Sequence, residues 1–434
     1  MNPPQSKQKP RPPVAPGEGA TLDQWLSWLE SIHPTEIDLG LDRVLVVLRR
    51  LFRKKPTARV ITVAGTNGKG STVATLEALL LAAGRRTGAY TSPHLQKYNE
   101  RIRIDGVDVD DATLISAFEK VEAARGSVTL TYFEFGTLAA FVALNEFGVQ
   151  DWILEVGLGG RLDAVNVIDA DLAIITSIDI DHVAFLGDNR EVIGFEKAGI
   201  LRPGIPAVVA DEDPPRSVLQ QAAAQKVALV RAGHEYTIQE VVTGPGESAV
   251  TLHVQDDSYR LPSGPLPVQS VAAAVMALRS LEPEMDQAAI EAALVRVKAP
   301  GRFERLGHKP DLYVDVGHNP HAAKWLSARL QALKTKGQKV HAVYAALEDK
   351  DVEGVAHAMA PAVDYWFLAG LDVHRGLGSE TLRARLESAP LLHTSTHDTV
   401  VDAIAAAKAG AETQDIIIVF GSFFTVAGAR RLLL

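Results

Sequence analysis

The chain has 434 residues, of which 47% are hydrophobic and 22% charged, with a formal net charge of -9 at pH 7. Its length exceeds that of one ordinary domain, so two or three domains are expected. The acidic balance argues against a general nucleic-acid-binding protein, and the lack of cysteine excludes disulfides, zinc–thiolate sites and thiol catalysis. Without a signal pattern at the N-terminus or an apolar run that could span a bilayer, we expect a cytoplasmic location and no membrane partner.

The first half of the chain shows an alternation of helices and strands. Residues 1–19 are rich in Pro, Lys and Gln and have little to bury, which predicts a disordered tail. Thr21 is expected to cap an amphipathic helix over residues 22–32. Strands are predicted at residues 60–64, 152–156 and 171–178, and a helix at residues 71–84. Because these strands are apolar on both faces and are separated by helices, they predict a parallel sheet.

A glycine-rich loop, GTNGKGS (residues 65–71), lies between the first of these strands and the helix. Glycines let backbone N–H groups approach a phosphate, the helix N-terminus attracts anions, and Lys69 can reach the β- and γ-phosphates. The match to G-x-x-x-x-G-K-[ST] is imperfect, because Val63 replaces the first Gly and Gly70 follows the lysine. The alternative is a plain glycine-rich turn with a solvated lysine. The residues of this loop have little packing rationale, which favours a phosphate site.

A bound triphosphate needs magnesium, which prefers oxygen ligands. Glu155 ends an apolar strand, and an acid at the carboxyl end of such a strand points into the ligand crevice of an α/β sheet. Asp179, Asp181 and His182 follow another buried strand, and their spacing alone does not choose among them. Lys197, on a predicted helix, reads by itself as a surface lysine.

Pro and Gly interrupt the pattern at residues 298–306, after which a shorter strand–helix alternation begins. In DVGHNPHAA (residues 315–323) an acid and a histidine follow a predicted strand, and Asn319 is expected to cap the next helix. The chain is therefore expected to be an α/β protein. It should have an N-terminal P-loop parallel-sheet ATPase domain at residues 20–298 and a smaller Rossmann-like α/β domain at residues 299–434.

Several motifs together resemble one family. They are IDLGLDR, GTNGKGS, TSPHL, YNERIRI, LTYFEFGT, EVGLGGRLDAVN, SIDIDHVAFLG, EKAGIL, PGRFE, DVGHNPHAA and FGSFFTVA. In this order they resemble the bacterial dihydrofolate synthase/folylpolyglutamate synthase family, within the Mur-like ADP-forming amide ligases. The resemblance extends from about Leu22 to the C-terminus. It implies two domains, with ATP bound in the N-terminal one near the interface.

The resemblance also implies site residues. The nucleotide-binding residues would be Thr66, Asn67, Gly68, Lys69, Gly70, Ser71, Ser270, Arg302 and Asp315, the last two closing on ATP from the C-terminal domain. The ligands of Mg²⁺, for which two ions are expected, would be Ser92, Glu155, His182 and Lys197. The dihydropteroate pocket would be lined by Asp38, Leu39, Gly40, Thr131 and Leu162.

Three of these residues are expected to serve catalysis directly, namely Lys69, His182 and Lys197. Lys197 resembles a lysine that carbon dioxide carbamylates, which turns a cation that would repel the metal into an anionic oxygen ligand. Two positions depart from the family pattern. Ser270 stands where an asparagine usually contacts ATP, and Phe424 replaces a histidine. A hydroxyl can replace only one of the hydrogen bonds of the amide, so the contacts with adenine and glutamate are expected to differ from the family pattern there.

The implied activity is addition of L-glutamate to dihydropteroate and to folates. ATP would phosphorylate the carboxylate, and the amino group of glutamate would attack the acyl phosphate. The partners would be these small molecules only, and the protein a monomer. A rival reading is the same fold with one of the two activities. A cell-wall Mur ligase is disfavoured because the P-loop at residue 65 leaves no room for a preceding domain. A silent nucleotide-binding module is disfavoured by the intact Lys69, Glu155 and His182.

Overall fold

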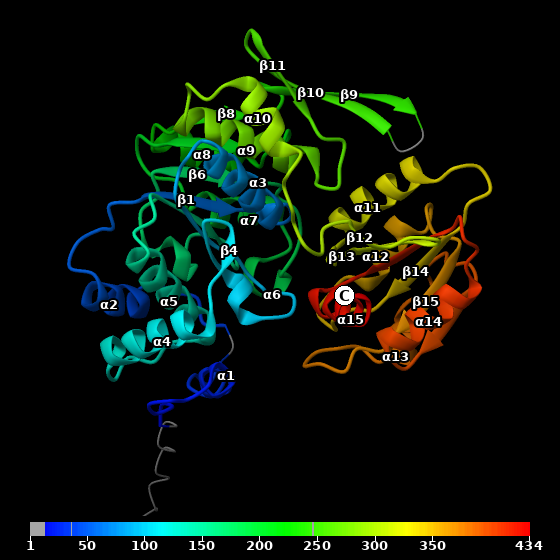
Figure 1. Cartoon of the computed structure of the whole chain (residues 1–434), viewed down its shortest axis with the longest axis horizontal. Coiled ribbons are helices and arrows are strands. Elements are labelled where there is room, and N and C mark those ends of the chain that lie inside the picture. Colours follow the sequence, from blue (N-terminus) through cyan, green and yellow to red (C-terminus); the bar gives the residue numbers. More distant parts are fainter. Residues whose placement is uncertain (1–13, 36, 245–246) are drawn as a thin grey trace, which may run out of the picture.

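The computed structural model describes residues 14–35, 37–244 and 247–434, so most of the predicted tail lies outside the described residues. Two α/β bodies lie side by side, the N-terminal one in blue to green and the C-terminal one in yellow to red (Figure 1). Within the described part of the chain, no helix is both long and apolar enough to cross a membrane.

The N-terminal body is built on an eight-stranded sheet of order β4-β3-β2-β5-β1-β6-β7-β8. Its strands are β1 (Arg59–Ala64), β2 (Thr87–Tyr90), β3 (Ile102–Ile104), β4 (Val107–Asp108), β5 (Asp151–Glu155), β6 (Leu172–Ile175), β7 (Pro206–Val209) and β8 (Ala228–Arg231). All neighbours pair in parallel except β3, which pairs antiparallel with both β2 and β4. This confirms the predicted parallel sheet, although β6 is shorter than expected because the chain leaves the sheet at Thr176.

Helices cover both faces of this sheet. They are α1 (Leu22–Leu29), α2 (Asp42–Leu51), α3 (Lys69–Ala82), α4 (Asp111–Arg125), α5 (Tyr132–Glu146), α6 (Val183–Leu186), α7 (Arg190–Ala198), α8 (Arg216–Ala224), α9 (Val268–Leu281) and α10 (Gln287–Leu294), with short 3-10 turns at Tyr98–Arg101 and Ala164–Val167. One core lies among α1, α2, α4 and α5, and a second among α3, α9 and α10. Thr21 caps α1 with a reciprocal capping box to Gln24, as its position predicts.

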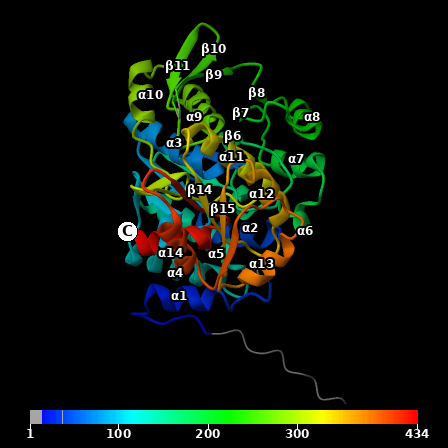
Figure 2. The same ribbon diagram turned by 90° about the vertical axis from the view of Figure 1, so that its right-hand side faces the viewer.

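A small antiparallel sheet was not anticipated from the sequence. It has the order β11-β10-β9 and consists of β9 (Thr237–Gly244), β10 (Glu247–Val254) and β11 (Asp257–Leu261). Val250, Leu252 and Tyr259 of this sheet are buried against the second core. Figures 1 and 2 both place the small sheet at the end of the molecule opposite α1.

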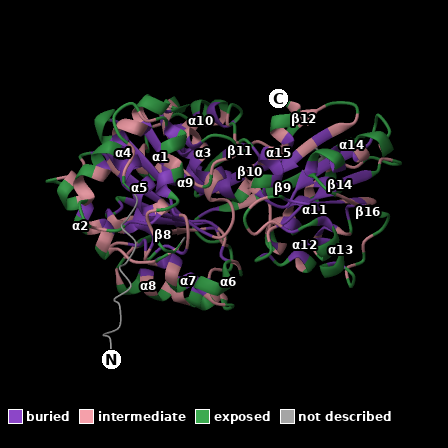
Figure 3. Ribbon diagram, turned by 90° about the horizontal axis from the view of Figure 1, so that it is seen from below, coloured by how far each residue is buried: buried purple, intermediate pink, exposed green. Residues whose placement is uncertain are grey.

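The C-terminal body has a six-stranded sheet of order β12-β13-β17-β14-β15-β16, parallel except for β12. Its elements are β12 (Glu304–Gly307), β13 (Asp311–Asp315), α11 (Pro320–Leu333), β14 (Val340–Tyr344), α12 (Val352–Met359), β15 (Tyr365–Ala369), α13 (Ser379–Arg385), β16 (Thr394–His397), α14 (Val400–Gly410), β17 (Ile416–Phe420) and α15 (Phe423–Leu433). Buried residues run through the centre of each body and exposed residues lie outside (Figure 3). The predicted two-part α/β fold is thus confirmed, with the smaller Rossmann-like unit second.

Candidate active site

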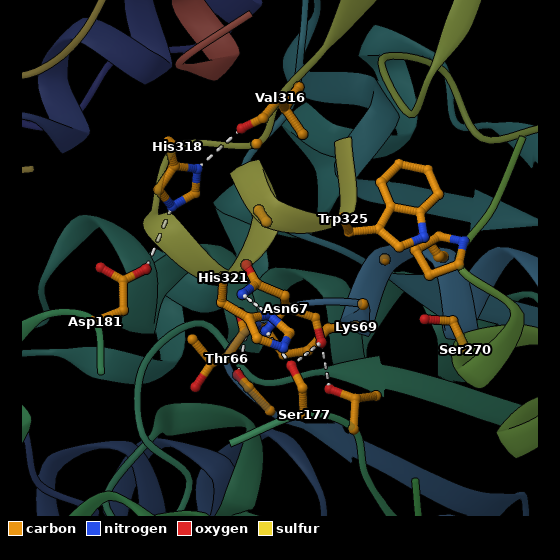
Figure 4. A pocket seen from close by; sticks show the side chains of 18 of the residues that line it. Thr66, Asn67, Lys69, Ser177, Asp181, Ser270, Val316, His318, His321 and Trp325 are labelled. Atoms are coloured by element: carbon orange, nitrogen blue, oxygen red, sulfur yellow. Dashed lines mark hydrogen bonds and ion pairs between the residues drawn. The ribbon is translucent and has the colours of Figure 1, made fainter. Parts of the chain in front are cut away.

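A cavity of about 580 Å³ lies between the two bodies, at the carboxyl ends of the N-terminal strands (Figure 4). Because β1, β2, β5 and β6 run in parallel, the loops that follow them meet at one edge of the sheet. Among the residues that line the cavity are Thr66, Asn67, Gly68, Lys69, Gly70, Ser71, Ser92, Glu155, His182, Lys197, Ser270, Arg302 and Asp315. The expected nucleotide and metal residues are therefore brought together in one place.

The glycine-rich loop is shaped by close approaches that only glycine permits. Gly68 has φ +88°, and a Cβ atom there would lie 2.5 Å from Oγ of Ser270. A Cβ atom on Gly65 would lie 1.7 Å from Oγ1 of Thr176. That hydroxyl donates instead to the carbonyl oxygen of Asn67 at 2.7 Å, which fixes the middle of the loop. Since Gly68 takes the left-handed N-cap position, α3 begins directly at Lys69, two residues earlier than predicted.

Lys69 places its ammonium beside this loop. Its Nζ donates to the carbonyl oxygens of Gly65 at 3.0 Å and Thr66 at 3.3 Å. Loss of hydration lowers the pKa of Lys69, an effect that the negative charge of Glu155 opposes. A cation partly stripped of water and next to a helix N-terminus suits a bound phosphate.

Glu155 is a buried carboxylate at the end of β5, and burial raises its pKa. The backbone N–H of Ser92 donates to its Oε2 at 3.3 Å, the only hydrogen bond that the described residues give this carboxylate. Such a group retains free lone pairs facing the cavity, which fits a divalent cation. In the described ranges, no three His, Cys, Asp or Glu side chains form a ready metal site. A metal here would therefore depend on hydroxyl, lysine-derived and phosphate oxygens as well.

Lys197, read as a surface lysine from its helix alone, is only 3% exposed near the end of α7. Burial, and next the repulsion of Lys69, lowers the pKa of Lys197 to about 7. At neutral pH, Lys197 is then a neutral amine in about half of the molecules. His182 is exposed towards the cleft. The walls of the cavity that it lines still remove part of its hydration, which lowers its pKa despite the opposing charge of Asp181, so the imidazole is neutral at neutral pH and can donate a lone pair.

The two aspartates beside His182 have distinct places. Asp179 lies against the glycine-rich loop, where its carbonyl oxygen accepts a hydrogen bond from Oγ1 of Thr66 at 2.9 Å. Asp181 turns to the other body, where its carboxylate contacts His318, Asn319 and Lys350. Asp179 thus supports the loop through its backbone, whereas Asp181 reaches the other body through its side chain, a difference that spacing alone could not assign.

The C-terminal body supplies the opposite wall. The guanidinium of Arg302 lies 5.0 Å from the ring centre of Phe423, whereas Phe424, the departure from the family pattern, is 48% exposed. Asp315 is buried, and its carboxylate accepts from the backbone N–H groups of Gly317 at 2.7 Å and Phe303 at 2.8 Å.

Asn319 caps α11 as predicted, by accepting from the N–H of Ala322 at 2.9 Å. It also exchanges amide hydrogen bonds with Asn67 at 3.0 and 3.1 Å, which joins the second body to the glycine-rich loop.

The Mur ligase middle domain family matches residues 63–278, and the family "Mur ligase, glutamate ligase domain" matches residues 301–423. The dihydrofolate synthase/folylpolyglutamate synthase of Escherichia coli K12 is 42% identical over 412 residues, or 95% of each chain. The chain belongs to the dihydrofolate synthase/folylpolyglutamate synthase family.

Solved structures of family members share the whole fold. Escherichia coli FolC in complex with DHPP and ADP has a TM-score of 0.91 at 40% identity, covering 96% of this chain and 99% of that one. A bifunctional folylpolyglutamate synthase/dihydrofolate synthase from Yersinia pestis, complexed with AMPPNP and Mn ion, has a TM-score of 0.89 at 41% identity. It covers 97% of this chain and 100% of that one. The fold of this family member is therefore the Mur ligase fold.

The five residues expected for the pteroate are not among those that line the cavity. Thr131 caps α5 and shares a capping box with Glu134. Glu134 accepts from Arg43 at 2.8 Å, and Arg43 also donates to Asp38 at 2.6 Å, so Asp38 and Thr131 belong to one network. Leu39 and Gly40 follow Asp38 in the same loop, and Leu162 lies in the loop after β5.

Phe133 connects this group to the cavity. Its ring would lie 2.6 Å from a Cβ atom on Gly157, and Gly157 lines the cavity. Helix α5, which Thr131 caps, thus packs against the wall of the cavity.

Sequence reasoning missed several residues of this family member's cleft. Thr176 was read only as part of a strand, His321 stood inside DVGHNPHAA without a role, and neither Trp325 nor Lys350, which holds Asp181 beside the cavity, lay in any motif. Trp325 and His321 lie on α11 and line the cavity (Figure 4). Lys350 follows β14, and its place after the carboxyl end of a buried parallel strand is the one signal that could have marked it.

Proposed function

We propose that this chain is an ATP-dependent amide ligase that adds L-glutamate to dihydropteroate, forming dihydrofolate, and to folates, forming polyglutamates. The observation that carries this proposal is the meeting of Lys69, Glu155 and Lys197 with Arg302 and Asp315 around one cavity between the two bodies. The relatives with DHPP and ADP, or AMPPNP and Mn, bound support the same ligand classes. The match to a glutamate ligase domain supports glutamate as the amino acid.

Amide formation needs an activated carboxylate, because a free carboxylate is a poor acylating agent. Transfer of the γ-phosphoryl group of ATP to the substrate carboxylate breaks its bond to the bridging oxygen of ADP and forms an acyl phosphate. Lys69 and Arg302 would neutralise the charge that develops on the transferring group. The amino group of glutamate then attacks the acyl carbon, and phosphate leaves as the amide nitrogen loses a proton.

A divalent cation, two Mg²⁺ ions in our proposal, would neutralise negative charge on the triphosphate. Ser92, Glu155 and His182 would hold it, together with a carbamate on Lys197. The pKa of Lys197, about 7, supports this role, because only the neutral amine attacks carbon dioxide. In that step a nitrogen–carbon bond forms, the amine releases a proton, and the product is an anionic oxygen ligand.

Dihydropteroate would be held by Asp38, Leu39, Gly40, Thr131 and Leu162. The network through Arg43 and Glu134 supports this assignment, because it fixes the first loop against the start of α5. Ser270 and the glycine-rich loop, residues 66–71, would contact ATP. Ser270 has its hydroxyl close to Gly68, at the place where the family has an asparagine.

We propose that the chain divides at residues 298/299, in the segment between α10 and β12. Closure of the second body over the cavity would exclude water and protect the acyl phosphate from hydrolysis. Because both walls of the cavity come from one chain, a monomer is sufficient for this function.

The test is ADP release by the purified chain with ATP, magnesium and glutamate, using dihydropteroate in one assay and a reduced folate in another. Turnover of both acceptors, each dependent on glutamate, is the expected result. Turnover of the folate without dihydropteroate would leave a folylpolyglutamate synthase only, and the reverse a dihydrofolate synthase only. Release of ADP with neither acceptor, or no release at all, would overturn the ligase proposal.

A further inference from the structure

Asp181 lies on the loop of the N-terminal body that precedes His182, yet its carboxylate is held by the C-terminal body. Lys350 donates to Oδ1 at 2.8 Å and Asn319 to Oδ2 at 3.0 Å. Nε2 of His318 lies 3.4 Å from the same Oδ2. The side chains of Asp181 and Lys350 are only 9% and 8% exposed. Three polar groups of one body thus converge on one carboxylate of the other.

Hydrogen bonds within the C-terminal body fix the backbone of Lys350. Arg385 on α13 donates to the carbonyl oxygens of Glu348 at 2.8 Å and Lys350 at 3.0 Å. The N–H of Lys350 bonds to the carbonyl oxygen of Leu347 at 3.2 Å, which closes the turn after β14. Lys350 is therefore presented to Asp181 by a fixed turn.

Polar contacts hold the exposed part of the loop that carries His182. His182 has φ 51°, a left-handed conformation that a non-glycine residue keeps only when its surroundings hold it. Its neighbours Ile180 and Val183 are 45% and 51% exposed, so no core anchors them. Local polar contacts hold its backbone: the N–H of His182 donates to Oδ1 of Asp181 at 2.8 Å, and its carbonyl oxygen accepts from the N–H groups of Phe185 at 2.9 Å and Leu186 at 3.0 Å. Only the bond to Oδ1 of Asp181 is linked to the other body. The same oxygen accepts from Lys350.

We propose that the Asp181–Lys350 pair is an interdomain positioning contact that places His182 only when the C-terminal body has closed. Lys350 fixes Oδ1 of Asp181, and Oδ1 fixes the backbone N–H of His182, so closure and formation of the metal site occur together. The inference rests on the proposed function for the role of His182. Lys350 and Asp181 are positioning residues in this account, since they act through His182.

The test compares Lys350→Met with Lys334→Met. Lys334 forms a Lys–Asp pair of similar geometry, 2.6 Å from Asp364, but entirely within the C-terminal body. Lys350→Met should raise the Mg²⁺ concentration for half-maximal ADP release about 10-fold or more, as loss of an outer partner of a metal ligand does elsewhere. Lys334→Met should leave it unchanged, and Lys350→Arg should restore most of the difference.

A second readout does not depend on turnover. Calorimetric titration of each variant with AMPPNP and Mg²⁺ should show weaker binding for Lys350→Met, and small-angle scattering should show a larger radius of gyration with the analogue bound. Asp181→Asn combined with Lys350→Met should be no worse than either single change, because the two residues act as one unit. Thermal unfolding of all variants checks that each is folded.

Two results would overturn the proposal. Unchanged Mg²⁺ dependence and unchanged analogue binding in folded Lys350→Met would do so. So would a rise in the KM for glutamate alone, because Lys350 would then be a ligand of the substrate carboxylate. Failure of the proposed function would give a different result, namely no ADP release by the unmodified chain. Calorimetry would still measure how Lys350→Met changes the binding of AMPPNP and Mg²⁺.

Discussion

Replacement of Lys69 by methionine removes the ammonium but keeps most of the side-chain volume. The loop should survive this change, because its shape depends on its glycines and on the bond from Thr176 to Asn67. In the described part of the chain, Nζ of Lys69 donates to the carbonyl oxygens of Gly65 and Thr66, and both residues line the cavity. Burial of the ammonium costs free energy because it loses hydration, and replacement by methionine removes that cost. We therefore expect a fall in Tm of less than about 4 °C, corresponding to about 1 kcal/mol or less in a domain of this size.

The effect on catalysis should be much larger. Removal of one preorganised donor from a developing negative charge lowers kcat by about 10²- to 10³-fold, equivalent to about 2.7–4 kcal/mol. A charged donor beside the transferring phosphoryl group should lie at or above the upper end of that range. Glutamate-dependent ADP release at saturating ATP measures kcat, and its ATP dependence gives KM.

Lys55→Met is a suitable control, because Lys55 is 48% exposed and pairs with Asp171 at 3.1 Å, outside the residues that line the cavity. It should retain the unmodified kcat. A kcat for Lys69→Met within about threefold of the unmodified value, which is only about 0.7 kcal/mol, would refute the phosphate-loop reasoning. A large loss of Tm together with activity would instead assign Lys69 a structural role.

Three further predictions follow from the same geometry. Glu155→Gln keeps the shape of a buried side chain but removes its charge, so the half-maximal Mg²⁺ concentration in the ADP-release assay should rise at least about 10-fold; an unchanged magnesium curve would contradict its role as a ligand. Lys197, with its pKa lowered to about 7, is protonated below that pH and neutral above it, so stimulation by bicarbonate in carbon dioxide-depleted buffer should increase from pH 6 to pH 8. Stimulation of equal size in Lys197→Arg would disprove carbamylation at this position. Thr131→Ala removes the N-cap of α5 and should lower the free energy of unfolding in urea by about 0.5–2 kcal/mol. Val128→Ala, a change just outside the helix, provides a comparison of the lost packing alone, and an equal effect of both would exclude the cap as the cause.

Local features of this fold could be predicted because their causes are local. Thr21 and Asn319 cap helices through hydrogen bonds to residues three positions away, so the pattern of side chains is enough. The apolar runs around Ile61 and Ile153 predict strands buried on both faces. The sheet of β9–β11 was missed, because its strands pack on the second core with one face only and give a weaker signal.

The sequence by itself determined the α/β class, the place of the glycine-rich loop at residues 65–71 between a strand and a helix, and the family. It did so because loop chemistry, strand periodicity and the order of the motifs are all written in consecutive residues. Only the tertiary structure decided that Lys197 is buried, that Asp179 supports the loop and that Asp181 faces Lys350, a residue 169 positions away. Burial and charge pairing depend on which segments the fold brings together, and spacing along the chain carries no information about that.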